Sequence, residues 1–89
     1  MNIEHNKTEQ GGEFFILDAQ KNKIAKLTYF YENPQRINAN HTYVSEVLRG
    51  QGIADKLYQT LIEFIEHNQL SLHPTCSYIA QKWERNQAK

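Results

Sequence analysis

Hydrophobic and polar residues alternate through the first half of the chain, as they do along strands that bury one face. Residues 13–17 form a short apolar run and residues 23–31 alternate, so we expect these two segments to pair as a β-hairpin. Between them, Asn22 can adopt the left-handed conformation that a turn requires. Asn33 and Pro34 then interrupt the pattern, and a third strand is expected at residues 36–44.

In the second half of the chain, the apolar spacing changes to that of an amphipathic helix. The apolar residues of this segment lie four apart, at Ile53, Leu57, Leu61 and Ile65. We expect about four helical turns that end at Asn68, a residue suited to a left-handed cap. A second helix is expected to begin near Ser77 and to bury Ile79 and Trp83.

With a brief strand at residues 69–73, the elements follow in the order β-β-β-α-β-α. This order predicts an α/β fold of the α+β type, with a mixed, mostly antiparallel four-stranded sheet. The strands before and after the first helix should form its parallel pair. One helix on each face of the sheet is the compact arrangement. The 89 residues are expected to form one domain, 1–89, in which the polar segment 1–12 is loosely ordered.

Composition and charge narrow the function. Ten basic residues balance ten acidic ones, which argues against nucleic acid as a partner. No apolar run approaches the roughly 18 residues of a membrane span, so no membrane partner is expected. The single Cys76 cannot form an internal disulfide and no signal peptide is recognisable, which predicts a cytoplasmic protein. The histidines lack metal-ligand spacing, so no metal site is expected, and the oligomeric state is left open between a monomer and a weak dimer.

A short loop that contains Gly50 and Gly52 precedes the first predicted helix. Glycines let the backbone approach a ligand closely, and the first amides of a helix are unpaired donors at the positive end of its dipole, so such a loop binds phosphate oxygens. A Rossmann fingerprint would need a small residue where Asp55 stands. A Walker loop would need four residues between its glycines, and here Gln51 alone separates them. Both loops are excluded, and a glycine-rich turn without a ligand is the remaining alternative.

The whole loop sequence has a more specific resemblance. Arg49, Gly50, Gln51, Gly52, Ile53 and Ala54 match the R/Q-x-x-G-x-G/A signature of the GNAT superfamily of N-acetyltransferases. Val44, five residues before Arg49, stands where that family ends its central strand. Residues 41–44, the loop and residues 74–78 together resemble a minimal branch of GNAT proteins of about this length. The resemblance covers nearly the whole chain, and the loop is its most specific part.

This resemblance implies acetyl-CoA, or free coenzyme A, as the cofactor. The backbone N–H groups of Arg49 through Ala54 would bind the pyrophosphate, and Val44 with its neighbours would hydrogen-bond the pantetheine arm between splayed parallel strands. A usual GNAT domain is longer, and two helices after its first strand help to form the acceptor pocket. Nothing in this chain fills that role. The site for the amine acceptor, a small molecule or a protein, is therefore expected to be shallow and open.

Three residues are candidates for the chemistry, because amine acetylation needs a neutral amine and a proton for the departing thiolate. Cys76 lies just before the second predicted helix, whose N-terminus would lower its pKa, so it is expected to carry the acetyl group or to protonate the cofactor sulfur. A small buried hydrophobic role is its alternative. His41 is a candidate base or a structural histidine. Tyr78 is a candidate acid or a packing residue.

The function expected from these residues is acetyl-CoA-dependent N-acetyl transfer to an amine, through a ternary complex or an acetyl-cysteine intermediate. One alternative is a non-catalytic module that binds coenzyme A or acetyl-CoA, and another is a small interaction domain without a cofactor. Binding of coenzyme A separates the last alternative from the other two, and turnover with an amine separates the enzyme from the module.

Overall fold

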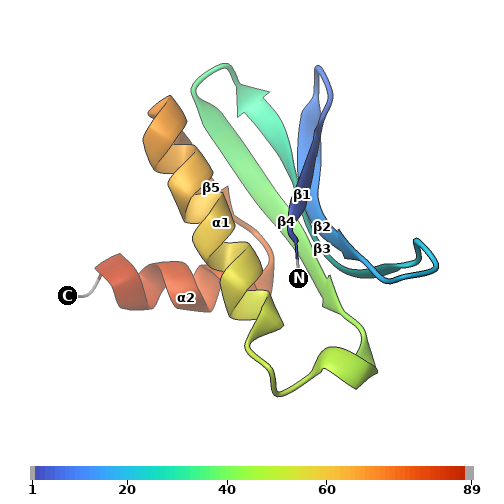
Figure 1. Cartoon of the computed structure of the whole chain (residues 1–89). Helices are drawn as coiled ribbons and strands as arrows, with labels where there is room; N and C mark the ends of the chain where they lie inside the picture. Colours follow the sequence, from blue (N-terminus) through green and yellow to red (C-terminus); the bar gives the residue numbers. More distant parts are fainter. Residues whose placement is uncertain (1, 88–89) are drawn as a thin grey trace.

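A computed structural model describes residues 2–87 as a five-stranded sheet with two α-helices packed on it (Figure 1). The strands are β1 (Glu4–Lys7), β2 (Gly11–Leu17), β3 (Lys23–Asn33), β4 (Arg36–Val44) and β5 (Ser71–Pro74). The helices are α1 (Ile53–Asn68) and α2 (Ser77–Gln87), and a 3₁₀ turn, η1 (Glu46–Leu48), lies between β4 and α1. The mixed α+β class predicted from the sequence is confirmed.

The sheet has the order β1-β2-β3-β4-β5, and its neighbours are antiparallel except for the parallel pair of β4 and β5. The predicted parallel pair is confirmed, whereas the predicted count of four strands is wrong. The additional strand is β1, in which Glu4 pairs with Phe15 of β2. All of its residues are exposed, so no apolar alternation marks it and backbone hydrogen bonding to β2 forms it. How loosely the segment 1–12 is held stays a prediction.

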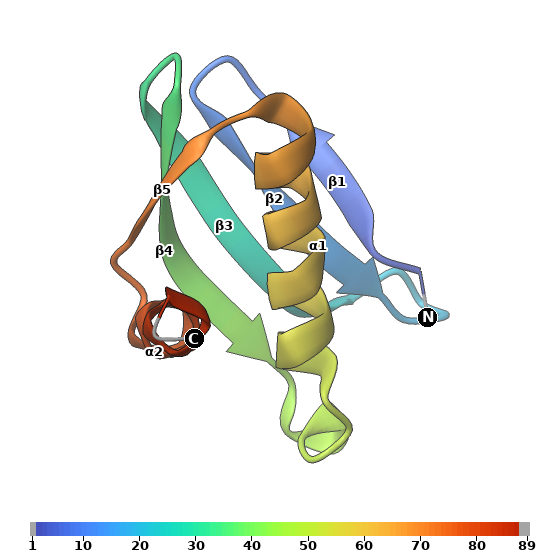
Figure 2. The same ribbon diagram turned by 90° about the vertical axis from the view of Figure 1, so that its left-hand side faces the viewer.

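Both helices pack on the same face of the sheet, as the two views in Figures 1 and 2 show. α1 contacts β2, β3 and β4, while α2 contacts β4 and β5. One core results, whose fully buried residues include Leu27 and Ile37 of the sheet, Leu57 and Leu61 of α1, and Ile79 of α2. The expectation of one helix on each face is wrong, because a chain this small fills one core rather than two. Neither α1 nor α2 covers the other side of the sheet, which we call the open face.

The left-handed residues at two predicted turns differ from the expectation. Helix α1 ends at Asn68 as predicted, yet its left-handed cap is Gln69 (φ 56°), and the Asn68 side chain donates to a carbonyl of its own helix. In the hairpin turn, Lys21 (φ 66°) is left-handed, while the Asn22 N–H donates to the Asp18 carboxylate. Both asparagines are engaged in local hydrogen bonds instead, a competition that residue type alone does not decide.

A β-bulge in β4 determines which of its side chains reach the open face. Thr28 of β3 is opposite His41, but the next residue, Tyr29, is opposite Ala39, so Asn40 is the extra residue. Before the bulge, the odd-numbered residues of β4 point to the helices, and after it they point to the open face. The bulge therefore places His41 on the open face.

β4 and β5 pair over a short distance and then diverge. Their pairing ends at Ala39 and Pro74. There the Ala39 carbonyl accepts the N–H groups of both Thr75 and Cys76, which turns the chain away from β4 toward α2. Within the described residues, the rest of β4, residues 40–44, has β3 as its only neighbouring strand. We call this point of divergence the fork.

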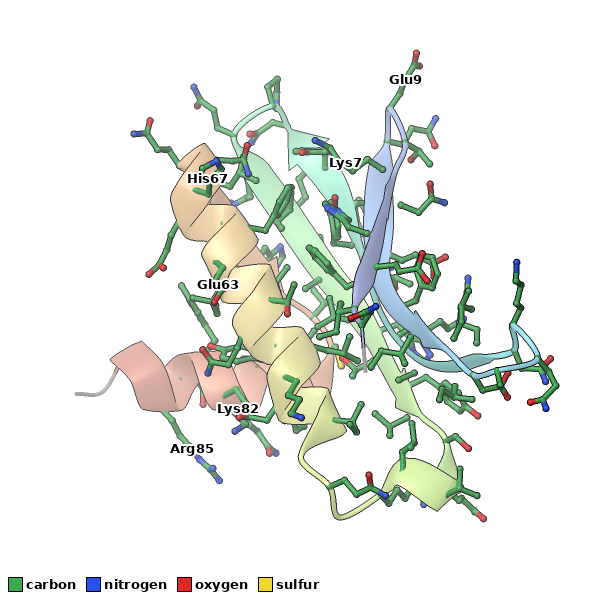
Figure 3. The ribbon with its side chains drawn as sticks, viewed as in Figure 1. Lys7, Glu9, Glu63, His67, Lys82 and Arg85 are labelled. Carbon is green, nitrogen blue, oxygen red and sulfur yellow. The ribbon has the colours of Figure 1, made fainter. Side chains whose placement is uncertain are left out.

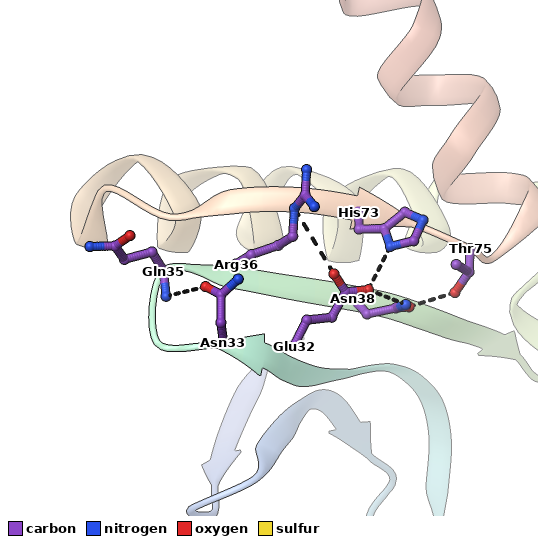
Figure 4. A network of polar contacts seen from close by, with 7 residues as sticks. All are labelled: Glu32, Asn33, Gln35, Arg36, Asn38, His73 and Thr75. Carbon is purple, nitrogen blue, oxygen red and sulfur yellow. Dashed lines mark hydrogen bonds and ion pairs between the residues drawn. The ribbon is translucent and has the colours of Figure 1, made fainter.

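A chain of polar contacts joins three strands beside the fork (Figure 4). Glu32 of β3 accepts a hydrogen bond from Asn38 Nδ2 of β4 at 2.8 Å and lies 2.5 Å from His73 Nδ1 of β5. Thr75 Oγ1 donates in turn to Asn38 Oδ1 at 2.5 Å. Hydrogen bonds from His73 and then from Asn38 are the main reasons why the pKa of Glu32 lies below its usual value. The contacts satisfy Asn38, which is only 7% exposed and would otherwise hold unpaired polar groups away from water.

Candidate functional site

A hollow of about 250 Å³ lies where the end of β4, the following loop and the first turn of α1 meet. We call it the loop pocket, and its lining residues are Val44, Leu48, Arg49, Gly50, Gly52, Ile53, Ala54, Asp55 and Tyr78. The structure therefore gathers every predicted cofactor-binding residue except Gln51 around one hollow. The Gln51 side chain is exposed and donates to the Val47 carbonyl at 3.4 Å instead.

Two glycines give the loop its shape. Gly50 (φ 83°) and Gly52 (φ 73°) both adopt the left-handed conformation that other residues rarely accept. A Cβ atom at either position would meet no atom within 4 Å. The backbone conformation, and not crowding, is therefore what requires glycine, and the space beside each glycine is open to a ligand.

The first turn of α1 brings unpaired backbone amides to the loop pocket. The first hydrogen bond at this end of the helix runs from the Lys56 N–H to the Gly52 carbonyl. The N–H groups of Ile53, Ala54 and Asp55 precede it and have no partner within the helix, and no side chain caps them. Donors at the positive end of a helix dipole are suited to bind an anion.

Arg49 offers its side chain to the loop pocket, whereas its backbone N–H was expected to bind the ligand. Its backbone N–H donates to the Glu46 carbonyl at 3.2 Å and closes η1. That amide is already paired, so the predicted row of ligand-binding amides does not begin at Arg49 in this conformation. The residue is exposed and lines the loop pocket, which leaves its guanidinium group available to an anion there.

A carboxylate in the pocket lining is neutralised by a lysine of α2. Asp55, in the first turn of α1, forms an ion pair with Lys82 Nζ, and Figure 3 shows Lys82 beside that turn. The hydrogen bond to Asp55 is the main reason why the pKa of Lys82 lies above its usual value. An isolated Asp55 would repel a phosphate group. Lys82 therefore removes an obstacle to anion binding in the pocket.

Cys76 lies at the fork, immediately before α2, and is half-buried. Its Sγ is 3.5 Å from Thr42 Oγ1 on β4. Burial would raise the pKa of Cys76, but hydrogen bonds from the Thr42 hydroxyl and from the N–H groups of Ile79 and Tyr78 outweigh burial and lower this pKa below its usual value. Partial exposure and a lowered pKa are typical of a reactive thiol more than of a packing residue.

Tyr78 lines the loop pocket from the first turn of α2. Burial is the main reason why the pKa of Tyr78 is raised. The phenol therefore stays protonated at neutral pH and can donate a hydrogen bond. Lys82 Nζ lies 5.9 Å from the centre of the Tyr78 ring, so the tyrosine and the ion pair with Asp55 occupy the same side of the pocket.

His41 is separated from the other two catalytic candidates. It is exposed on the open face, where it borders a second hollow together with Tyr43. The adjacent residue, Thr42, points to the opposite face and contacts Cys76. The structure thus brings Cys76 and Tyr78 together at the start of α2 and leaves His41 across the width of β4 from them.

Sequence reasoning missed three residues of this region: Thr42, Leu48 and Asp55. Thr42 stands two residues before Val44, a predicted site residue, and side chains two apart in a strand point to the same face. This spacing could have predicted that Thr42 faces the site. Asp55 entered the sequence argument solely as an obstacle to a Rossmann loop. Its pairing with Lys82 joins residues far apart in the chain, and no sequence signal marks such a contact.

Residues 2–87 offer no candidate for two other kinds of site. No group of three or more His, Cys, Asp or Glu side chains in this range is arranged to hold a metal ion. No helix in the same range has the length and apolar character needed to cross a membrane. Whether the protein uses a metal stays a prediction.

The fold and the loop pocket define a small α+β protein in which the N-terminus of α1, with unpaired backbone amides, lies beside a fork between parallel strands. Residues 13–89 match the sequence family described as GCN5-related N-acetyl-transferase. This chain belongs to that family, which confirms the resemblance seen in the sequence.

Individual relatives agree with this assignment. Protein NATD1 from Danio rerio is 30% identical over 86 residues, 97% of this chain and 76% of that protein. Protein NATD1 from Xenopus tropicalis is 34% identical over 62 residues, and the match covers 70% of this chain but 57% of the frog protein. A GCN5-like protein from Staphylococcus aureus, solved by NMR, is 32% identical with a TM-score of 0.73, covering 98% of this chain and 83% of that chain.

A more distant structure shares the fold alone. The ribosomal-protein-alanine N-acetyltransferase from Brucella melitensis is 17% identical with a TM-score of 0.65. The similarity covers 88% of this chain and 59% of that one, so the larger protein has substantial structure beyond the shared part.

Proposed function

We propose that this protein transfers the acetyl group of acetyl-CoA to an amine at the fork. The observation that carries the proposal is the meeting of three features in one region: a helix end with unpaired amides, a stretch of β4 without a strand on one side, and a cysteine with a lowered pKa. Membership of the GCN5-related N-acetyl-transferase family supports acetyl transfer as the class of reaction.

The loop pocket would hold the coenzyme by its pyrophosphate. The unpaired amides of Ile53 and Ala54 are suitable donors, and Gly50 and Gly52 let the backbone approach the phosphates. The pantetheine arm would lie along residues 40–44 of β4, in the space that β5 leaves, and would hydrogen-bond to the strand edge as an added strand does. Neutralisation of Asp55 by Lys82 makes the pocket compatible with this dianionic linker.

Acetyl transfer moves one proton along with the acetyl group. The nitrogen of a neutral amine forms a bond to the thioester carbon, the carbon–sulfur bond breaks, and the proton lost by nitrogen ends on the coenzyme sulfur. In one route the amine attacks the thioester directly, Cys76 gives its proton to the departing sulfur, and the proton that the amine loses restores the Cys76 thiol. In the other route the Cys76 thiolate takes the acetyl group first, coenzyme A leaves, and the amine then attacks the acetyl-cysteine.

Tyr78 and His41 would assist at different ends of this reaction. Tyr78 is the candidate acid, because its protonated phenol borders the loop pocket. His41 is the candidate base for an amine that approaches from the open face. Because no helix covers that face, the acceptor site is shallow, and specificity rests on a few side chains of the sheet.

An NMR titration with coenzyme A tests the binding step. We expect shifts to concentrate at Val44 and residues 50–54, with the β1 signals as an internal control because β1 lies at the far edge of the sheet. If neither coenzyme A nor acetyl-CoA at millimolar concentration moves these signals, the proposal is wrong.

Thiol release from acetyl-CoA with a panel of amines tests turnover. Intact mass after incubation without an amine tests the route, because a gain of one acetyl group that is absent in Cys76→Ala marks the acetyl-cysteine. Cys76 is the one cysteine of the chain, so no other thiol can give this result. Binding of coenzyme A without turnover of any amine would leave a binding module and exclude the enzyme.

A further inference from the structure

The second hollow lies on the open face and has a volume of about 230 Å³. It is lined by Lys23, Lys26, His41 and Tyr43. In the register of the sheet, Lys26 of β3 stands directly between Phe15 of β2 and Tyr43 of β4. The hollow is therefore built on the middle of the sheet, on the face that lacks a helix, and we call it the lysine hollow.

The lysine hollow contains one uncompensated ammonium group. Lys23 lies 2.5 Å from Glu13 Oε1 and over the Phe15 ring, so its charge is already matched. Lys26 has no ion pair and no side-chain hydrogen bond among the residues that the structure describes. A half-buried lysine without a partner attracts a negative group of a ligand. One free charge suits a carboxylate better than a doubly charged phosphate group.

The lysine hollow also borders the fork. His41 and Tyr43 line it and flank Thr42, whose hydroxyl contacts Cys76 on the opposite face. Consecutive residues of a strand point to opposite faces of the sheet, so the hollow and the thiol lie on the two sides of the same stretch of β4. Beyond Ala39 that strand has no β5 residue beside it, so a ligand in the hollow lies next to an open strand edge.

We infer that the acetyl acceptor is an amine joined to a carboxylate by a carbon chain, and that Lys26 binds the carboxylate while the chain rounds β4 at the fork, where the pantetheine arm would end, and brings the amine toward Cys76. This inference rests on the proposed acetyl transfer and names its substrate class. His41 and Tyr43 would border the acceptor, and the exposed Tyr43 ring, 44% accessible, would cover its carbon chain.

Matched acceptor pairs test the inference. Acetyl transfer is measured with 4-aminobutyrate against 4-aminobutyramide and with 6-aminohexanoate against 6-aminohexanamide, whose amines lie far enough from the varied group to reach past β4 and to keep similar basicity, in wild type, Lys26→Met and Lys7→Met. We expect the acid of each pair to have a kcat/KM roughly threefold to tenfold above that of its amide in wild type. Lys26→Met should bring this ratio to about one, and Lys7→Met, with the same charge change on β1, should keep it. High salt should also reduce the ratio.

A parallel NMR titration with the same four compounds separates the two hypotheses. Turnover with equal rates for acid and amide, or an acid preference that persists in Lys26→Met, overturns the inference and leaves acetyl transfer intact. If no compound is turned over but the acids alone shift Lys26, His41 and Tyr43, the hollow binds carboxylates, and the proposed function fails together with the acceptor assignment. No turnover and no shift overturn both.

Discussion

The two halves of β4 differ in what lies beside them and in what they do. Residues 36–39 have a strand on each side, and three consecutive residues, Ile37, Asn38 and Ala39, are buried. Residues 40–44 have β3 on one side alone, and none of them is buried. The first half carries the packing and the Glu32–Asn38–Thr75 network, while the second carries Thr42, Val44 and the side chains of both hollows.

This division separates stability from function along a single strand. A backbone edge inside a sheet is saturated with hydrogen bonds and cannot accept a ligand, whereas an edge that its neighbour has left can accept an extended chain. The fork makes one strand serve both purposes in a chain of 89 residues. Changes in the first half should therefore affect folding, and changes near the second half should affect binding and reactivity.

The largest expected effect comes from the paired half. Ile37 is 0% exposed, so Ile37→Ala should lower the free energy of unfolding by about 2–5 kcal/mol, measured by urea titration. His41→Ala, on the exposed half of the same strand, is the control and should change stability by no more than about 0.5 kcal/mol. Equal losses in the two variants would show that the halves do not differ in this way.

The second-largest expected effect is on coenzyme A binding and concerns the glycine loop that follows residues 40–44 of β4. Gly52→Asp should weaken coenzyme A binding by about 30-fold or more, because it introduces a negative charge beside the proposed pyrophosphate site. Gly52→Asn is the matched control, since asparagine tolerates a positive φ without adding a charge, and it should retain most of the affinity. Calorimetric titration of both variants measures the difference. Comparable binding by the Asp variant and wild type would remove the cofactor from this loop.

The sequence correctly predicted those elements whose residues show the apolar spacing of the structure they form. The alternation of residues 23–31 predicted β3, with Ala25, Leu27 and Tyr29 buried and Phe30 exposed. The helical spacing after Gly52 predicted α1 to its last residue. The loop before α1 was predicted from its two glycines, because glycine is the residue that most readily accepts the left-handed conformation found there.

The remaining features depend on contacts between distant residues. β1 has no apolar pattern and is visible solely through its pairing with β2. The face of His41 depends on a bulge at Asn40, and a single extra residue inverts the alternation on which such a prediction rests. Helix α2 carries both predicted residues inward: Ile79 is fully buried, and Trp83 is half-buried against the core.

Loss of the Asp55–Lys82 ion pair should have a smaller effect on coenzyme A binding. Lys82→Met should weaken coenzyme A binding roughly two- to fivefold, because it leaves the Asp55 carboxylate unmatched in the loop pocket. Adding Asp55→Asn should restore the affinity, since the repulsion disappears with the charge. Arg85→Met, on the same helix but pointing away from α1 in Figure 3, is the control for a simple loss of positive charge. A double variant as weak as Lys82→Met would instead mean that Lys82 touches the cofactor directly.

The smallest expected effect concerns the thiol at the fork. Thr42→Val removes a hydrogen bond that lowers the pKa of Cys76, so this pKa should rise and less thiolate should be present at neutral pH. Alkylation of Cys76 by iodoacetamide, followed by intact mass, should be roughly two- to threefold slower in the variant than in wild type near neutral pH. At a pH above the Cys76 pKa of both proteins the two rates should match, because the thiol is then ionised in each. Thr60→Val, whose hydroxyl bonds within α1, is the control. If the rate near neutral pH is unchanged, the amides at the start of α2 alone set the reactivity of Cys76, and β4 contributes an edge for binding but no tuning of the thiol.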